Sequence, residues 1–257
     1  MRQALHAECT KLRTLSGTRW LLLATFALTV AVSALAAAVS YPHAGATRDL
    51  SKLSLTGIQL GQALVALLAV VTISNEYSSG MIRTTLAAMP RRPIVLAAKA
   101  LIVGIPVLTV GTLSAVACLL VGQLILPGKG FTPAHGYASL SLLDGPTLRA
   151  AAGSAIYLAL IALLSLGVAT ALRDSATAIG AVLGLLYLFP IGAALVTNPH
   201  WQRHLQQIGP MTAGLAIQTT TNLRHLPIGP WAGLGVLTAW TATALLTGGL
   251  LLRQRDA

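Results

Sequence analysis

Six long apolar stretches constrain this chain more than any other feature of its sequence. A helix needs about 20 mostly apolar residues to cross a hydrocarbon core of roughly 30 Å. Lipid offers no hydrogen-bond partner to an open backbone, so each stretch must be helical. The sequence therefore predicts an all-α membrane protein, a single transmembrane domain over residues 1–257, with spans at about residues 20–39, 57–74, 101–126, 149–172, 176–197 and 231–252.

The composition agrees with this class and argues against a nucleic-acid-binding protein. Only 9% of the residues are charged and 55% are hydrophobic, whereas a soluble domain carries about 25% charged residues. The formal net charge is +11, but the basic residues form small clusters between apolar runs, without the interleaved aromatic residues of a nucleic-acid surface. We interpret the basic excess as a signal of topology and of contact with membrane lipid headgroups.

The distribution of basic residues predicts the orientation. With the N-terminus in the cytoplasm, eleven of the 17 Lys and Arg residues fall in inner segments, as the positive-inside rule requires. Six spans then place both termini in the cytoplasm of a multi-pass protein of the cell membrane. The first run also resembles a secretory signal, with Ala34-Leu35-Ala36 like a cleavage site, but it continues to the length of a full span.

Two prolines and the N-terminal segment add local expectations. Pro106 predicts a kink or tilt in the third span, and Pro190 a bend in the fifth. Residues 2–18 repeat apolar side chains at helical spacing among basic ones, which favours an amphipathic helix in the cytoplasmic interface. A solvated tail is the alternative for that segment.

The loop at residues 76–93 carries the most information. A short helix is expected at about residues 81–89, capped by Ser78 or Ser79 and ended by Pro90. Its apolar face would consist of Ile82, Leu86 and Met89. Such a helix has few apolar partners among the spans, so it is suited to dock onto another protein; the alternative is that it lies on lipid.

At this point the residues resemble a family. In three regions this chain is similar to the permease subunits of type-2 ABC exporters. The similarity is closest to the short permeases of actinobacterial and Gram-positive drug and peptide export systems. The first and main one is the loop, with Glu76-Tyr77-Ser78-Ser79-Gly80, Ile82-Arg83-Thr84-Thr85-Leu86, Pro90-Arg91-Arg92 and Ala97-Ala98-Lys99. The others are Glu8-x-x-Lys11-Leu12-Arg13-Thr14 with Arg19-Trp20, and Pro210-x-x-Ala213-Gly214-x-Ala216.

The resemblance implies an ATP-driven exporter that works with a separate ATP-binding subunit and with a second permease half, either identical or different. The cargo would be amphipathic, such as a drug, a peptide antibiotic or a lipid, so that efflux and resistance are the expected roles. It also implies a re-entrant or surface-lying outer segment at residues 198–230. The residues expected to couple the spans to the ATPase are Glu76, Gly80, Ile82, Arg83, Leu86, Arg91 and Arg92, with the turn Arg173-Asp174 as a second contact.

Glu76 needs a partner because an unpaired charge near the end of a span is costly. We expect it to pair with Arg83, with Arg91 or with a helix N-terminus, and so to hold the loop in place. We assign it no catalytic role, since no nucleophile or metal cluster accompanies it. The chain has no G-x-x-x-x-G-K-[ST] motif, so ATP hydrolysis is expected in the partner subunit, and we predict neither an enzyme nor a cofactor in this chain.

Other polar and small residues leave alternatives open. Gln59 and Gln62 lie on one face of the second span, where they either line a translocation path or join helices. His200 and His204 have the spacing of a helical metal pair, but no third ligand is evident, so no metal site is predicted. Rows of small residues that favour close helix packing or a dimer seam are Gly57 and Gly61, Gly111 and Ala115, and Ala176, Gly180 and Gly184.

Two other classes of membrane protein would have the same composition. One is a membrane-embedded enzyme that modifies lipid or peptide, which the scarcity of acids and histidines within the spans disfavours. The other is a membrane scaffold or sensor without transport activity.

Overall fold

The computed structural model describes residues 16–42, 48–78, 81, 92–132, 137 and 140–254. All regular secondary structure within these ranges is helical, and six helical segments are long and apolar enough to cross a membrane. These spans are α2 (Ser16–Val39), α4 (Ile58–Ser78), α6 (Arg92–Ile125), α7 (Gly145–Leu172), the α8–α9 segment (Ser175–Leu195) and α12 (Pro230–Gln254). The predicted fold class, an all-α protein of six spans, is confirmed.

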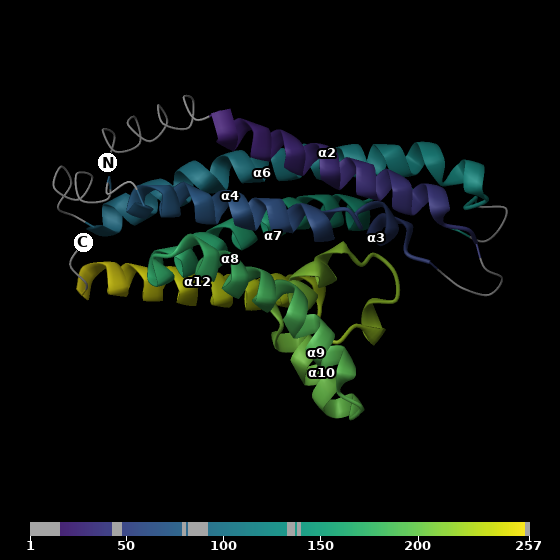
Figure 1. Ribbon diagram of the computed structural model, residues 1–257. Coiled ribbons are helices and arrows are strands. Elements are labelled where there is room, and N and C mark those ends of the chain that lie inside the picture. Colours follow the sequence, from purple (N-terminus) through teal and green to yellow (C-terminus); the bar gives the residue numbers. More distant parts are fainter. Residues whose placement is uncertain are drawn as a thin grey trace.

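Apart from α9, the spans run side by side along one axis (Figure 1), which gives the bundle two ends. At the end that we call proximal, α2 and α6 begin and α4, α7 and α12 end. At the opposite, distal end lie the short helix α3 (Leu50–Ser54), the turn η1 (Pro127–Lys129) and the segment between α9 and α12. The end of α4 and the start of α6, which flank residues 79–91 in the sequence, therefore both lie at the proximal end.

Helix α7 forms the centre of the bundle. It packs against α4, α6 and α12. Of the 18 residues in its most apolar stretch, 61% are buried, compared with 22% for the corresponding stretches of α2, of α8–α9 and of α12. Small residues allow this close packing. A Cβ atom at Gly167 of α7 would lie 2.6 Å from the backbone carbon of Ala244 on α12, so the two helices cross almost in backbone contact.

The predicted rows of small residues have different surroundings. Gly57 and Gly61 press against Thr29 of α2, and Gly111 of α6 faces Ala155 of α7, so these two rows serve packing within the chain. On α8 the situation differs. A Cβ atom at Gly180 would have no heavy atom within 4 Å, which leaves the small face of α8 uncovered.

One helix begins earlier than the sequence predicts, and another is irregular next to Pro190, where a bend was predicted. The helix that contains the third span begins at Arg92, nine residues before the predicted start of that span, and continues without interruption through Pro106. The fifth span is interrupted just before Pro190 by a π-helical turn, η3 (Gly184–Leu188), after which α9 (Phe189–Leu195) begins. π turns absorb an irregularity in the backbone ladder, here next to a residue that has no N–H to donate.

The expected interfacial helix at residues 2–18 lies outside the described residues except for its last three residues, which belong to α2. Of the expected docking helix at residues 81–89, only Met81 is described.

The segment between α9 and α12 folds back onto the bundle. Its helices are α10 (Pro199–Ile208), α11 (Pro210–Gly214), η4 (Leu215–Gln218) and η5 (Leu223–His225). Figure 1 shows α9 and α10 diverging sideways from the bundle axis. In contrast, α11 and η4 pack against α7 and α12, with Ile217 fully buried beside Gly153. The segment is thus partly embedded, in agreement with a re-entrant or surface-lying outer segment.

Candidate functional site

A buried ion pair joins α4 and α6 at the proximal end. Lys99 Nζ lies 2.5 Å from Glu76 Oε1, and the two side chains are 1% and 6% exposed. A charge in such a place is costly unless it is paired and hydrogen-bonded. Each residue therefore makes the burial of the other possible.

The pair ties together the two helix ends that flank the loop at residues 79–91. Glu76 lies two residues before the end of α4, and Lys99 lies seven residues after the start of α6. A displacement of the loop thus acts on two helices that are connected to each other directly inside the bundle.

Lys99 was not among the partners predicted for Glu76. The sequence does contain a signal for it, since a single lysine inside an apolar helix requires an acidic partner, and Glu76 is the acid nearest to it in the sequence. Arg83 and Arg91 lie outside the described residues, so their expected pairing with Glu76 stays a prediction.

The predicted second contact, Arg173-Asp174, forms the turn between α7 and α8 next to this pair. Arg173 has a left-handed backbone with φ of 62°, and its N–H caps α7 by donating to the Ala169 carbonyl at 3.0 Å. The Arg173 guanidinium lies 5.7 Å from the centre of the Tyr77 ring, a cation–π arrangement. The turn is thereby held against the end of α4, one residue from Glu76.

Asp174 caps the start of α8. Its Oδ2 accepts hydrogen bonds from the Thr177 hydroxyl at 2.6 Å and from the Thr177 backbone N–H at 2.7 Å. These bonds favour the carboxylate and lower the pKa of Asp174 from its ordinary value.

The structure therefore brings Glu76 and Arg173 together through Tyr77 and places Asp174 beside them. Arg92 is the first residue of α6. The remaining predicted coupling residues lie outside the described part of the chain, and their roles stay predictions: Gly80, Ile82, Arg83, Leu86 and Arg91.

Gln62 joins three helical elements in the interior of the bundle. It is fully buried, its Oε1 accepts from the Tyr157 hydroxyl of α7, and its Nε2 donates to Met211 Sδ of α11 at 3.3 Å. A buried side-chain amide that uses both its oxygen and its nitrogen fixes helices relative to one another. This bonding favours the packing role among the two hypotheses for Gln62.

Gln59 differs from Gln62 in its surroundings. Its backbone carbonyl accepts from the Tyr187 hydroxyl at 2.5 Å, and its side chain borders a cavity of about 300 Å³ under the segment between α9 and α12. Polar side chains of this cavity also come from Lys52, Gln206 and Thr219. Of the two glutamines, Gln59 is therefore the one that borders a cavity with polar lining residues.

A second polar cluster holds the segment between α9 and α12 at the distal end. The Asp49 carboxylate caps α3 and accepts from the backbone N–H groups of Thr220 and Thr221, with Oδ2 3.0 Å from the Thr221 nitrogen. Arg149 donates to the Thr219 carbonyl at 2.7 Å. We call this cluster the distal latch. It was missed from the sequence because its partners are separated by 70 residues or more.

His200 and His204 do approach each other on α10, with 3.3 Å between their Nε2 atoms. Among the described residues no group of three or more His, Cys, Asp or Glu side chains is arranged to hold a metal ion.

No protein-family model matches the chain, and a comparison with curated proteins finds no match. The class that the fold defines is a multi-pass helical membrane protein.

Proposed function

We propose that this chain is the membrane-spanning permease subunit of an ATP-driven exporter, which moves an amphipathic substrate across the cell membrane together with a separate ATP-binding subunit. The observation that carries the proposal is the buried Glu76–Lys99 pair, which connects the helix ends on both sides of the loop whose motifs resemble those of type-2 exporter permeases. The positive-inside rule favours a cytoplasmic location for this end, and ATP is available there.

The physical requirement on such a subunit is that force applied at the loop moves the spans. Helices are stiff, and a loop joined to two loosely packed helix ends would bend without moving them. Here the ion pair between α4 and α6 and the contact of Arg173 with Tyr77 make the proximal ends of α4, α6 and α7 one unit. ATP-driven closure of the partner subunits would then tilt these spans together.

The uncovered face of α8 supports a second permease half in this assembly. Ala176, Thr177 and Gly180 are exposed there, and only 22% of the most apolar window of this span is buried within the chain. Small side chains let two helix backbones approach closely in lipid. A second copy of this chain or a different permease would pack against this face.

The proposal is tested by purifying the full chain from its native membrane in mild detergent. We expect a protein with a P-loop motif to co-purify and to hydrolyse ATP. The double change Ile82→Asp and Leu86→Asp should abolish this association, because charged side chains would disrupt an apolar docking face. Leu143→Asp is the matched control, since Leu143 is 89% exposed at the distal end and its change should leave the association intact.

A second measurement separates coupling from assembly. Glu76→Gln with Lys99→Met removes the ionic connection between α4 and α6 without leaving a buried ion without its partner, so this double variant should retain the ATPase subunit but show reduced stimulation of ATP hydrolysis by substrate. A purified chain that carries no ATPase, or one that turns over a lipid or peptide by itself, would contradict the exporter and favour the membrane-embedded enzyme.

A further inference from the structure

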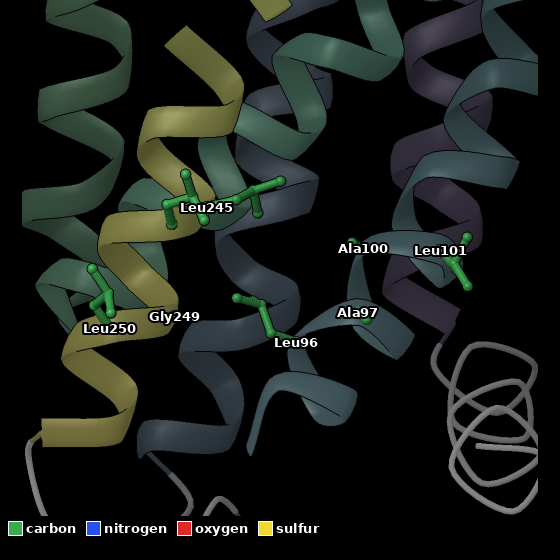
Figure 2. A pocket seen from close by; sticks show the side chains of 8 residues that line it. Leu96, Ala97, Ala100, Leu101, Leu245, Gly249 and Leu250 are labelled. Carbon is green, nitrogen blue, oxygen red and sulfur yellow. The ribbon is translucent and has the colours of Figure 1, made fainter. Parts of the chain in front are cut away.

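Two surface features of the molecule differ in whether they select a ligand. Figure 2 shows the groove between α6 and α12, with Leu96 on one wall and Leu245 and Leu250 on the other. All its lining residues are leucine, alanine or glycine. Specific recognition requires polar groups in a fixed geometry, which this groove lacks and helix α10 provides.

His200 and His204 bring the same ring nitrogen together on α10. Their Nε2 atoms are 3.3 Å apart, and their ring centres are 4.4 Å apart. Residues four positions apart lie on the same face of a helix. Both side chains are exposed, so an ion in solution has access to the two rings.

The backbone beneath the pair is held at both ends. Asn198 Oδ1 accepts a hydrogen bond from the His200 backbone N–H at 3.0 Å and so caps the start of α10. Near the end of the helix, Gln207 Nε2 donates to the Pro227 carbonyl at 2.6 Å, which ties α10 to the chain before α12. The two imidazoles are therefore carried by a fixed helix and adjust only by rotation of their own side chains.

The distance between the two nitrogens fits a tetrahedral zinc ion. Two nitrogens bound to zinc at about 2.0–2.1 Å lie about 3.3 Å apart at the tetrahedral angle. Imidazole is a preferred ligand of zinc, whereas Mg²⁺ and Ca²⁺ take oxygen ligands. The pair therefore supplies two of the four ligands of zinc, and water would complete the coordination.

A hydrogen bond between the two rings is the competing explanation. The separation of 3.3 Å lies just beyond the usual range of about 2.7–3.2 Å for N–H···O bonds, so the geometry favours coordination slightly. Arg203 opposes a cation, because it is exposed on the same helix and its charge repels a divalent ion, although solvent screens this repulsion. The two explanations differ in what zinc does to the helix.

We propose that His200 and His204 form a two-histidine site for Zn²⁺ on the surface of α10. The spacing in the sequence does not predict this site, since a third ligand is missing; the distance between the nitrogens supports it. A bound ion would connect two successive turns of α10 and stiffen the helix, which borders the cavity of about 300 Å³ through Gln206. The site does not depend on the proposed exporter function.

Zinc binding is measured by isothermal titration calorimetry on the full chain in dodecyl maltoside micelles, purified without a polyhistidine tag. His200→Ala and His204→Ala should each weaken binding at this site roughly 100-fold, because the second imidazole binds intramolecularly. His225→Ala is the matched control: His225 is an exposed histidine of η5, and its loss should leave the affinity unchanged. Arg203→Gln should tighten binding by removing a positive charge.

Amide hydrogen exchange places the ion on α10. Zinc should slow exchange at residues 203–208 in the parent chain and in His225→Ala, but not in His200→Ala or His204→Ala. Magnesium at the same concentration should have no effect. Because both histidines are exposed, their replacement should preserve the fold, and exchange without zinc checks that α10 remains helical in each variant.

Several results would overturn the proposal. They are zinc affinity that survives in either alanine variant, exchange in α10 that zinc does not slow, weaker binding in Arg203→Gln, or an equal effect of magnesium. Loss of affinity in only one of the two variants would indicate binding by a single histidine and would refute the pair. A dimer that forms only with zinc, detected by light scattering, would refute coordination within one helix.

Discussion

Replacing Lys99 with Met should destabilise the protein severely, because it removes the cation from a buried ion pair. The atoms Nζ and Oε1 are 2.5 Å apart, which corresponds to about 7 kcal/mol of Coulomb attraction at an effective dielectric constant of about 20. Desolvation of the two ions cancels most of this attraction. The single change, however, leaves the Glu76 carboxylate buried without its lysine, and such changes cost about 3–5 kcal/mol.

The double variant provides the decisive comparison. Glu76→Gln with Lys99→Met replaces both ions by neutral side chains of similar size, so most of the lost free energy of unfolding should return. A buried ion pair replaced as a whole is often energetically neutral. The expected coupling between the two single changes is therefore a few kcal/mol and opposite in sign to their costs.

The free energy of unfolding is measured in mixed dodecyl maltoside and sodium dodecyl sulfate micelles by far-UV circular dichroism, for the parent, both single variants and the double variant. Lys52→Met is the matched control: it removes an exposed lysine at the distal end and should change the free energy by no more than about 0.5 kcal/mol. Single costs below about 1 kcal/mol, or costs that simply add in the double variant, would refute the assignment of a buried and mutually dependent pair.

Three further predictions concern other parts of the molecule. Asp49→Ala should release the distal latch and speed amide hydrogen exchange at residues 218–221. Asp144→Ala is the control, because it removes an N-cap residue whose side chain makes no capping hydrogen bond, and it should leave this exchange unchanged. Equal exchange rates in the two variants would contradict the latch. Gly233→Ala should lower the thermal midpoint, since its Cβ would lie 2.0 Å from a carbonyl oxygen of α11, while Gly235→Ala on the same helix has open space and should be neutral or stabilising by up to about 1 kcal/mol. Hydrogen bonds lower the pKa of Asp174 in the folded state. The Asp174 cap should therefore stabilise α8 fully above the ordinary pKa of 3.8, and this stabilisation should be lost as the pH falls through the lowered folded pKa. If amide exchange in the first turn of α8 did not change across that acidic range, the capping role of Asp174 would be refuted.

The number of spans and their approximate places could be predicted from the sequence because they depend only on apolar length. The third span was predicted from about residue 101, whereas the helix that contains it begins nine residues earlier. Arg92 and Lys99 made the preceding stretch resemble a loop, although the helix begins at Arg92. A lysine inside a span is acceptable only once its partner is known, and Glu76 lies 23 residues away on another helix.

The polar contacts that organise the site depend on tertiary structure in the same way. Tyr157 and Gln62 are 95 residues apart, and Asp49 and Thr220 are 171 residues apart. No local pattern contains such pairings. Gln62 illustrates the limit: the sequence identified it as a polar residue at depth, but only its two partners distinguish a residue that joins helices from one that lines a path.

Helix α4 connects the buried ion pair at the proximal end with the polar contacts in the distal half of the bundle. Its 21 residues span about 32 Å. Near its proximal end Glu76 binds α6, and in its distal half Gln62 bonds to α7 and to Met211 of α11. A tilt imposed at the loop at residues 79–91 would therefore reach the segment between α9 and α12 through one stiff helix whose contacts at both ends are polar and directional. Since the distal latch holds the same segment from the other side through Asp49, such a tilt would have to strain or open the latch. The polar contacts of this bundle thus lie towards the ends of its central helices, which is where the proposed exporter function would require them.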